Sequence, residues 1–556
     1  MLLFPMHSEN IIKITEDFNP QRVIEEIAYI GKFHRIQGSE GLVKAAEHLY
    51  EEVKNLGLET RFIVEYYDGE RVFANMKTPI AWEPIYGEVQ IQERKITTEK
   101  SMLVIMAHSP PGEAEGEIKF VEREEDWGDV KGKIVMVDED WRDNYRKACE
   151  HGAIGYIIYR KGLQNAIPYV GLFLSKEDLR WAKIPAVAID ENWAVEIKNR
   201  IKRGKKVKGK ILVKSKIKDK EILPIIYATI GKPPYILFSA HLCHPEPGAN
   251  DNASGSAMLL ELARILKRIY DESFRFGFAF LWIPEHIGSG AFIENHAKVN
   301  DFYGAINLDM VAGDRIMLIR APLSRFSVLS GVVEYFLEIF NSAPPSMGRV
   351  PEVISSVNPY HLGSDHDIFN FFGIPAITLI TWPDPYYHSS EDSVDKLNKR
   401  TVEIIGKCAL ASVLFLSKEA LRDFARAYAM KYLGELGMRR KIRISKSLVN
   451  RGLYRDGKYL SINIGKDMQE NGWLLWSKKG MISPQNLKGE KEKSELKEIY
   501  KDRRNMVLLH ELLMLGEVLD RKRCFEALSE EYGDYKKNVL MKAIEILQNE
   551  DFIKII

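Results

Sequence analysis

The pattern of hydrophobic and polar positions divides the chain into stretches of different texture. Near the start, apolar residues recur every three or four positions in segments 19–33 and 39–57, which predicts two amphipathic helices. Ser39 is a candidate N-cap and Gly57 a candidate stop for the second helix. The run ETRFIVEYY that follows, residues 59–67, predicts a strand.

Between about Trp82 and Lys214 the pattern changes to short β-rich runs. One predicted helix, NYRKACEHG at residues 144–152, interrupts them. The runs are GEVQI, SMLVIMAH, KIVMV, GYIIY, PAVAI and KILVK. Runs of this length that are rich in Val and Ile are typical of strands. We therefore predict that residues 79–219 form a small separate domain, β-rich or α/β, inserted into a larger one.

From about Leu223 the chain alternates apolar runs with amphipathic segments. YILFSAH, FRFGFAFLWI, YGAINLDM and PAITLIT predict strands, and the segments between them predict helices. Near-continuous apolar strands are expected where helices cover both faces of a mostly parallel sheet. The sequence thus predicts an α/β fold with a mostly parallel mixed sheet and helices on both faces. The N-terminal helices complete the same layers, so residues 1–78 and 220–420 are expected to form one domain.

Beyond about residue 421, charged helices replace the alternating pattern. LYRDGKYLSI predicts a hairpin with Asp456 and Gly457 at its turn. The last segments predict short helices, consistent with a winged-helix-like domain over residues 421–556. Such a unit can bind nucleic acid or mediate oligomer contacts. However, the basic run RRKIRISK that begins at Arg439 is typical of a solvated face, so we do not expect nucleic-acid binding.

Composition narrows the class of protein. A hydrophobic fraction of 45% supports folded cores, and a net charge of +1 excludes a globally basic nucleic-acid binder. Abundant lysine, glutamate and isoleucine are typical of heat-adapted proteins. The N-terminal stretch lacks the basic lead of a signal peptide, and no window reaches the roughly 18 apolar residues of a membrane span. The four cysteines lie too far apart in the sequence for a disulfide framework, which favours a reducing compartment; they are Cys149, Cys243, Cys408 and Cys524. We therefore expect a cytoplasmic protein.

Residues of metal-ligand type occur at the ends of successive predicted strands. One of them alone would usually be structural, but sites in open α/β sheets form outside the carboxyl ends of strands. Zinc takes imidazole nitrogen and carboxylate oxygen, a carboxylate can bridge two metals, and a further carboxylate beside them can act as general base. The candidates are His241, Asp251 at the entrance of the next helix, Glu285 with His286, Asp309 and His388.

Four blocks in this part of the chain resemble a known family. SAHLCHPEPGANDNASG, PEHIGSGAF, NLDM and YYHSSEDSVDKL are similar, in this order, to blocks of the co-catalytic zinc peptidases, which include leucyl aminopeptidases, aminopeptidase Y and glutamate carboxypeptidase. The resemblance covers His34–Gly57 and Leu223–Leu397. It implies two Zn²⁺ ions, with Co²⁺ as an alternative, and peptide substrates. In the implied arrangement, His241 and Asp309 bind one zinc, His286 and His388 bind the other, and Asp251 bridges the two. Glu285 is the implied general base. Tyr387 is the implied oxyanion stabiliser, although Tyr386 could take this role or Tyr387 could be purely structural.

The chain departs from this family at two positions. The family has glutamate or aspartate where His286 stands; histidine still binds zinc, but the charge and metal preference of the site would change. The family also has an orienting aspartate where Cys243 stands. A thiol is a weak hydrogen-bond partner, and His244 and Glu246 lie close enough to compensate. We interpret His244 as a structural residue.

The resemblance implies an exopeptidase that removes N-terminal residues, but it leaves alternatives. A carboxypeptidase on the same scaffold is one, and Arg320 would then either pair with a substrate carboxylate or be an ordinary surface residue. A non-catalytic regulator with a nucleic-acid-binding winged helix is another, and single-zinc cyclotransfer is disfavoured. The insert is similar to protease-associated domains, and the whole arrangement resembles a prokaryotic aminopeptidase-like group with a C-terminal winged helix. Side-chain preference and a homo-oligomeric state are left open.

Overall fold

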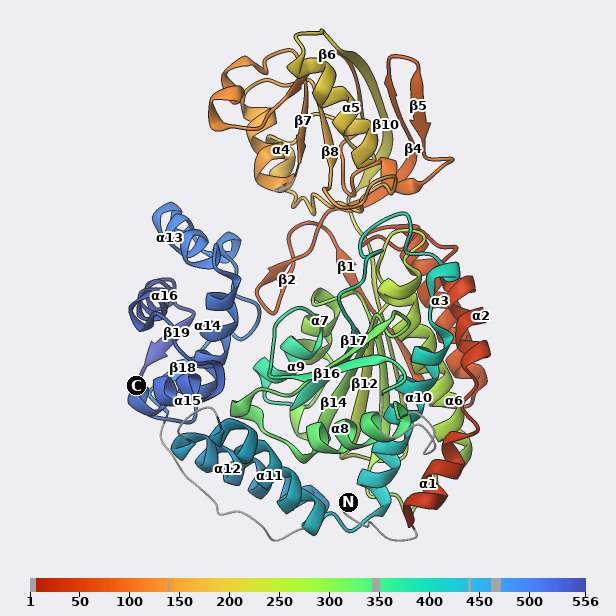
Figure 1. Ribbon diagram of the computed structural model, residues 1–556, viewed down its shortest axis with the longest axis vertical. Coiled ribbons are helices and arrows are strands. Elements are labelled where there is room, and N and C mark those ends of the chain that lie inside the picture. Colours follow the sequence, from red (N-terminus) through yellow and green to blue (C-terminus); the bar gives the residue numbers. More distant parts are fainter. Residues whose placement is uncertain (1–6, 139–140, 343–350, 439–441, 462–471) are drawn as a thin grey trace.

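A central sheet of eight strands organises the largest part of the protein (Figure 1). The computed structural model describes residues 7–138, 141–342, 351–438, 442–461 and 472–556. The four middle strands are parallel, and antiparallel or mixed strands flank them on both sides. In spatial order the strands are β1 (Glu59–Tyr67), β11 (Glu221–Ile230), β13 (Gly277–Ile283), β12 (Tyr235–His241), β14 (Phe302–Asp309), β17 (Ala376–Thr381), β15 (Arg315–Ile319) and β16 (Ile354–Asn358).

Helices cover both faces of this sheet, as the apolar strands predict. α3 (Glu40–Asn55) and α6 (Gly255–Ile269) pack on one face, and α2 (Pro20–Ile30) and α10 (Lys399–Lys418) lie against α6. On the other face α7 (Ile287–Asn295) contacts β11, and α9 (His366–Phe372) contacts β14 and β17. α1 (His7–Thr15) and α8 (Val328–Phe340) both contact α10. The predicted α/β fold with a mixed sheet and helices on both faces is therefore confirmed.

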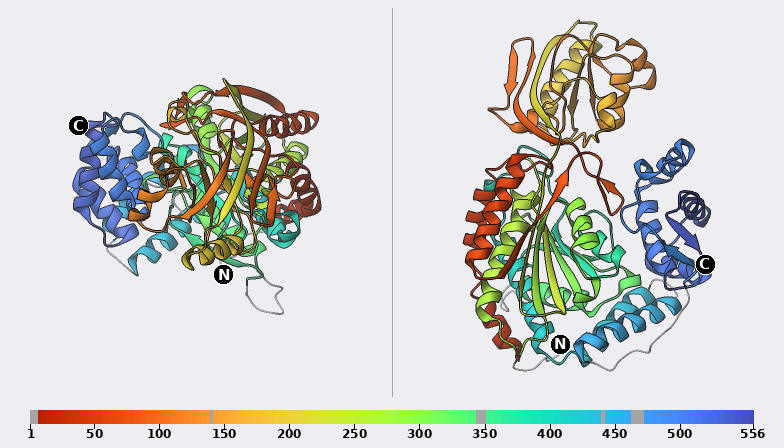
Figure 2. Two further views of the ribbon diagram at one scale, coloured as in Figure 1. Left: turned by 90° about the horizontal axis from the view of Figure 1, so that it is seen from above. Right: turned by 180° about the vertical axis from the view of Figure 1, so that it is seen from behind.

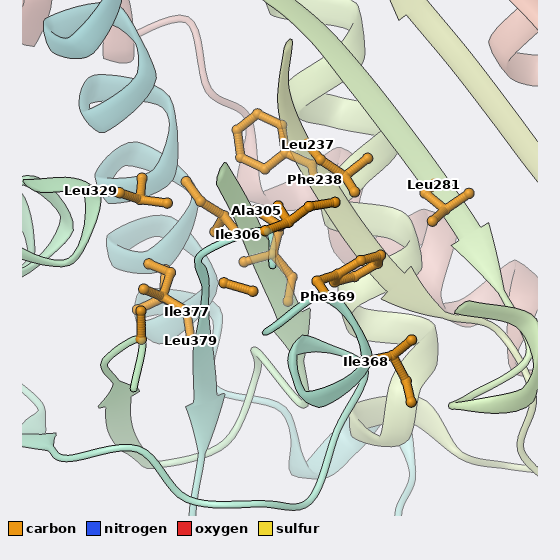
Figure 3. Close-up of a cluster of buried hydrophobic side chains, with 14 of the residues drawn as sticks. Leu237, Phe238, Leu281, Ala305, Ile306, Leu329, Ile368, Phe369, Ile377 and Leu379 are labelled. Atoms are coloured by element: carbon orange, nitrogen blue, oxygen red, sulfur yellow. The ribbon is translucent and has the colours of Figure 1, made fainter. Parts of the chain in front are cut away.

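The core of the central sheet is built from strand residues that point alternately to its two faces. Leu237 and Phe238 are neighbours on β12 and are both fully buried, because each face of the strand is covered. Figure 3 shows these side chains among Ile306 of β14, Leu329 of α8 and Phe369 of α9. This packing fixes the strands, and so fixes the positions of whatever follows their carboxyl ends.

A second sheet, of seven strands, forms the inserted unit (Figure 2). It has its own hydrophobic core and carries the helices α4 (Trp141–Glu150) and α5 (Glu191–Lys202). Its strand order is β5 (Arg94–Thr97), β4 (Ala81–Ile91), β10 (Lys208–Lys218), β6 (Gly112–Phe120), β7 (Ile134–Asp138), β8 (Gly155–Tyr159) and β9 (Ala186–Ala188).

One strand predicted in the insert is absent among the described residues. SMLVIMAH forms a short 3₁₀ helix, Met102–Val104, instead. The Ser101 hydroxyl accepts a hydrogen bond from the Leu103 N–H and caps this turn. The Met106 N–H then donates to the Ala186 carbonyl. A local cap therefore competes with strand pairing where the residue pattern alone favours a strand.

The predicted hairpin at Asp456 and Gly457 is wrong, because these residues lie within helix α12 (Arg443–Leu460). The Asp456 carboxylate caps a different helix: it accepts a 2.6 Å hydrogen bond from the Val328 N–H and another from the Ser327 hydroxyl at the start of α8. Asp-Gly is a strong local turn signal, but here a tertiary cap outweighs it. The other C-terminal elements are α11 (Arg422–Gly437), α13 (Glu490–Tyr500), α14 (Arg503–Gly516), α15 (Arg521–Tyr532), α16 (Lys537–Asn549) and the pair β18 (Leu474–Trp476) and β19 (Ile553–Ile555).

The C-terminal helices pack on the central domain instead of standing free. The ring of His510 on α14 stacks against Phe371, with 5.0 Å between the ring centroids, and buried Glu511 accepts a hydrogen bond from the Ser324 N–H. Arg320 is buried and pairs with Glu334 and with Glu435 of α11. It is therefore neither the surface arginine nor the substrate-facing cation that the sequence suggested. Among the described residues, no helix is long and apolar enough to cross a membrane.

Candidate metal centre

The ligand-type residues meet at one edge of the central sheet. His241 and Asp309 are the last residues of the parallel strands β12 and β14. Glu285 follows β13 after one proline, and Asp251 lies in the turn that leads into α6. His388 stands in the loop after β17. The carboxyl ends of neighbouring parallel strands share an edge, so the fold brings residues from five segments together there.

One group consists of His241, Asp251 and Asp309. The Nε2 atom of His241 lies 3.3 Å from Asp251 Oδ1 and 3.2 Å from Asp309 Oδ1. All three residues are almost completely buried. The other ring nitrogen of His241, Nδ1, lies 3.2 Å from the Cys243 carbonyl oxygen, which orients the ring. A backbone carbonyl thus takes the orienting place for which the family uses an aspartate, and the Cys243 sulfur instead accepts from the Glu285 N–H at 3.1 Å.

A second group consists of His244, Asp251 and His388. The Nε2 atoms of the two histidines approach the same oxygen, Asp251 Oδ2, at 3.3 and 3.2 Å. Asp251 therefore faces the first group with one oxygen and the second group with the other. A ligand shared by two metals would face them in this way, and the bridging role of Asp251 stays a prediction; the partner of His388 in this group is His244.

His286 lies outside both groups. Its backbone N–H donates a 2.7 Å hydrogen bond to Asp365 Oδ1, which also accepts from the Ser289 hydroxyl. The ring nitrogens of His286 lie 3.7 Å from Asp367 Oδ2 and 3.7 Å from Glu285 Oε1. The ring thus lies between a buried aspartate and Glu285 at distances too long for hydrogen bonds, and its role as a ligand stays a prediction.

Two polar side chains that the sequence did not single out hold the shared aspartate in place. Asp392 accepts hydrogen bonds from the N–H groups of Asn250 at 2.7 Å and Asp251 at 3.0 Å. The side chain of Asn252 donates to the Leu308 carbonyl and accepts from the Met310 N–H, both at 2.9 Å. The Asp251 turn is thereby tied to the end of β14 and to the segment after His388. SEDS and NDNAS are visible in the sequence, but no spacing rule indicates that they meet.

The electrostatics of the centre favour a bound cation. The carboxylates of Asp309 and Glu285 raise the pKa of His241 well above its ordinary value, although burial alone would lower it. Burial would raise the pKa of Asp251, yet the facing His244, His388 and His241 hold it well below its ordinary value. Both directions mean that positive charge is stabilised here. Imidazole nitrogens and carboxylate oxygens are donors that zinc accepts, so these residues fit the predicted metal.

Glu285 has the environment of a proton carrier. Its side chain is 33% exposed, and its partial burial raises the pKa of the carboxyl group to about 7, although the neighbouring His241 and His286 lower it. A group with this pKa can take and release a proton near neutrality. It stands beside the two groups without belonging to either one.

The inserted unit reaches into the centre through Tyr169. The Tyr169 N–H donates a 2.8 Å hydrogen bond to the His388 carbonyl, and the Ser390 N–H donates to the Ile167 carbonyl at 2.9 Å. The Tyr169 ring lies 4.8 Å from the His388 ring and 4.9 Å from the His244 ring, measured between centroids. Sequence reasoning missed this residue, because a single tyrosine in the insert carries no signal that it contacts a loop more than 200 positions away.

Tyr387 lies on the other side of His388. Its ring stacks on the histidine, with 3.8 Å between centroids, and burial together with the nearby Asp251, Glu285 and Asp309 raises the pKa of its hydroxyl. The ring of Tyr386 instead lies under the ammonium of Lys396. Of the two tyrosines that the sequence left open, Tyr387 is the one close to the carboxylates of the centre.

Comparison with known proteins shows what this part of the chain is similar to. Residues 225–413 match the sequence model of peptidase family M28, and they span β12, β13, β14 and β17 with their ligand-type residues. Aminopeptidase YwaD of Bacillus subtilis (strain 168) is 28% identical over 319 residues, which cover 51% of this chain and 62% of that protein. The chain thus spans less than two thirds of the length of this curated relative.

Solved structures share the fold that contains residues 225–413. BSAP, a zinc aminopeptidase from Bacillus subtilis, superposes with a TM-score of 0.52 at 18% identity, over 72% of this chain and 96% of its own. A peptidase M28 precursor from Shewanella amazonensis SB2B gives a TM-score of 0.55 at 18% identity, over 73% and 97%. At these identities the likeness establishes the fold alone.

Proposed function

We propose that this protein is a metal-dependent aminopeptidase that uses two zinc ions, with Glu285 as general base. The observation that carries the proposal is the pair of three-residue groups that share Asp251 beside the partly buried Glu285. The match of residues 225–413 to an M28 peptidase model and the similarity to a protein named as an aminopeptidase support it. Cobalt is the alternative metal, because it accepts the same donors.

The chemistry divides between the metals and the chain. Zinc ions bound at the two groups would activate a water molecule and polarise the scissile carbonyl. Glu285 takes the proton of the attacking water and passes it to the leaving amine. The raised pKa of its carboxyl group, about 7, suits this task, because a group with this pKa can both take and release a proton near neutrality.

Tyr387 is assigned to stabilise the oxyanion that forms on the substrate carbonyl. We expect Tyr387→Phe to lower kcat by about 10²- to 10³-fold with little change in KM, because the lost donor acts on charge that develops in the transition state. Steady-state kinetics on one good peptide measures this. Tyr386→Phe is the matched control and should stay within about twofold of wild type. A large loss in the control together with none in Tyr387→Phe would transfer the role to Tyr386.

Three contacts outside the two ligand groups bear on the choice between peptidase types and on the roles of the other domains. A carboxypeptidase on the same scaffold is the alternative, but Arg320 does not serve it, because this side chain is paired with Glu334 and Glu435. The insert closes over the centre through Tyr169, in keeping with a cap of the protease-associated type. Residues 421–556 are assigned as a winged-helix-like unit that packs on the central domain, since α14 buries Glu511 and His510 against it.

Hydrolysis of matched peptides tests the proposal. Each peptide is offered with free ends, with an acetylated N-terminus and with an amidated C-terminus, with added zinc or cobalt. We expect cleavage of the free and amidated forms from the N-terminal end, no cleavage of the acetylated form, and loss of all turnover in excess chelator. Cleavage of the acetylated form from its C-terminal end would make the protein a carboxypeptidase. Absence of turnover with either metal would refute the enzymatic proposal.

A further inference from the structure

We propose that His244, and not His286, completes the second metal site, so that the site is built from His244, His388 and Asp251. The inference rests on the proposed two-metal function and deepens it. Sequence comparison places the ligand directly after the base, at His286. The geometry moves it to a different loop, 42 positions earlier in the chain.

The first argument is where the two histidines point. His244 Nε2 lies 3.3 Å from Asp251 Oδ2, the same oxygen that His388 Nε2 approaches at 3.2 Å. The nearest carboxylate oxygens to the nitrogens of His286 belong to Asp367 and Glu285, both at 3.7 Å. His244 therefore shares the bridging carboxylate, and His286 does not.

The second argument is an unmet hydrogen-bonding need. Nδ1 of His244 lies 2.8 Å from the Pro245 carbonyl oxygen, an arrangement that requires the proton on Nδ1. In the neutral ring, Nε2 then carries a bare lone pair. This atom is buried and has no hydrogen-bond partner, which is also true of His286 Nε2, but of the two only His244 Nε2 faces the Asp251 oxygen that His388 approaches. Two lone-pair donors that face each other in a buried site are stabilised when a cation lies between them, and an orienting carbonyl on the far nitrogen is typical of metal-binding histidines.

The third argument is that the loop carrying His244 is built to hold the ring still. The backbone N–H of His244 donates to the Arg35 carbonyl at 3.0 Å, and the backbone N–H of Arg35 donates to the His244 carbonyl at 2.9 Å. The buried guanidinium of Arg35 donates to the carbonyls of Leu242 and Gly248. Gly248 has a φ of 49°, and a Cβ there would come within 2.4 Å of the His244 ring. The loop thus needs glycine at position 248 to make room for this imidazole. Contacts with Arg35 and with Gly248 together limit the movement of the loop and of the ring.

This assignment changes the chemistry of the site. Replacing the family's carboxylate with an imidazole removes one negative charge from the second metal, and two imidazoles favour zinc or cobalt over the harder magnesium and manganese ions. It also frees His286, whose ring lies between Asp367 and Glu285. His286 becomes a positioning residue for the base.

Metal content measured on the full chain tests the inference without relying on activity. His244→Asn keeps a donor for the Pro245 carbonyl and deletes the metal-facing nitrogen, and His286→Asn is the matched control. After equilibration with buffered zinc, we expect two ions per chain in wild type and in His286→Asn, but one in His244→Asn. In chelator competition the second ion should bind His244→Asn more than about 100-fold more weakly, a larger loss than outer residues typically cause.

Further variants and outcomes keep the result decisive. His244→Glu places a carboxylate near the same point and should restore the second ion with reduced affinity. A melting experiment on the metal-free chain shows whether His244→Asn folds as well as wild type. If it does not, the result for His244→Glu decides the question. Loss of an ion in His286→Asn, or two tightly bound ions in His244→Asn, would overturn the inference. Wild-type protein that binds two ions yet cleaves no peptide would refute the proposed function and leave the assignment of His244 intact.

Discussion

Glu285→Gln should lower kcat by about 10²- to 10⁴-fold while leaving both metal ions in place, because it removes the proton carrier and keeps the shape of the side chain. The glutamate contributes no atom to either three-residue group, so metal content is not expected to follow activity. Single-turnover kinetics on one peptide, with zinc determined on the same samples, measures both quantities.

Glu294→Gln provides the control for this substitution. Glu294 lies on α7, the helix that follows the base, and its carboxylate belongs to neither group. We expect its activity to stay within about twofold of wild type. If Glu285→Gln retained full activity with two ions bound, another group would have to serve as base. If it lost its metals, its role would be structural.

Asp251→Ala should remove both metals at once and abolish activity. The carboxylate is the only residue common to the two groups, and His241, His244 and His388 all approach its oxygens. Metals bound to the native state alone stabilise it by about 2.7 kcal/mol per site at a free concentration 100 times the dissociation constant. Wild type should therefore melt at a higher temperature when zinc is added, and Asp251→Ala should show no such rise.

Comparison with Glu285→Gln separates loss of metal from loss of catalysis. Both variants should be inactive, but only Asp251→Ala should lose the zinc-dependent rise in melting temperature. The melting temperature of Asp251→Ala without zinc should lie below that of metal-free wild type, because the substitution removes the carboxylate that faces the three histidines, so the effect of zinc is measured against each variant's own metal-free sample. Retention of two ions in Asp251→Ala would contradict the shared-ligand arrangement.

Much of the centre could be predicted from the sequence because its residues end apolar strands. His241 and Asp309 terminate runs whose parallel pairing follows from their composition, and the fold then forces their side chains to one edge. His244 and His286 could not be told apart in this way. Each lies beside a residue of the centre, and the direction of each side chain depends on distant groups, Arg35 for the first and Asp365 for the second.

The secondary structure, like the metal centre, could be predicted from the sequence only in part. Strand and helix positions in the central domain followed from periodicity, including the Ser39 cap, which accepts from the Leu42 N–H. The stretch around Asp456 did not, because its carboxylate caps α8 from across the domain interface. Gly452, in the same helix, packs closely on Phe326: a Cβ at this position would lie only 2.3 Å from the Phe326 carbonyl oxygen. Close helix packing therefore decided a segment that local turn rules assign differently.

The hydrogen bonds between the insert and the segment after β17 have a thermodynamic consequence. Tyr169 and Ile167 hold the carbonyl of His388 and the N–H of Ser390, so the insert cannot swing away without disturbing a residue of the second group. Closure of the insert and occupancy of that group are then coupled equilibria, and the coupling is reciprocal: an ion that favours the closed insert must bind more tightly when the insert is closed, by the same factor. A peptide that wedges the insert open would loosen the ion, and one that fits beneath it would tighten it.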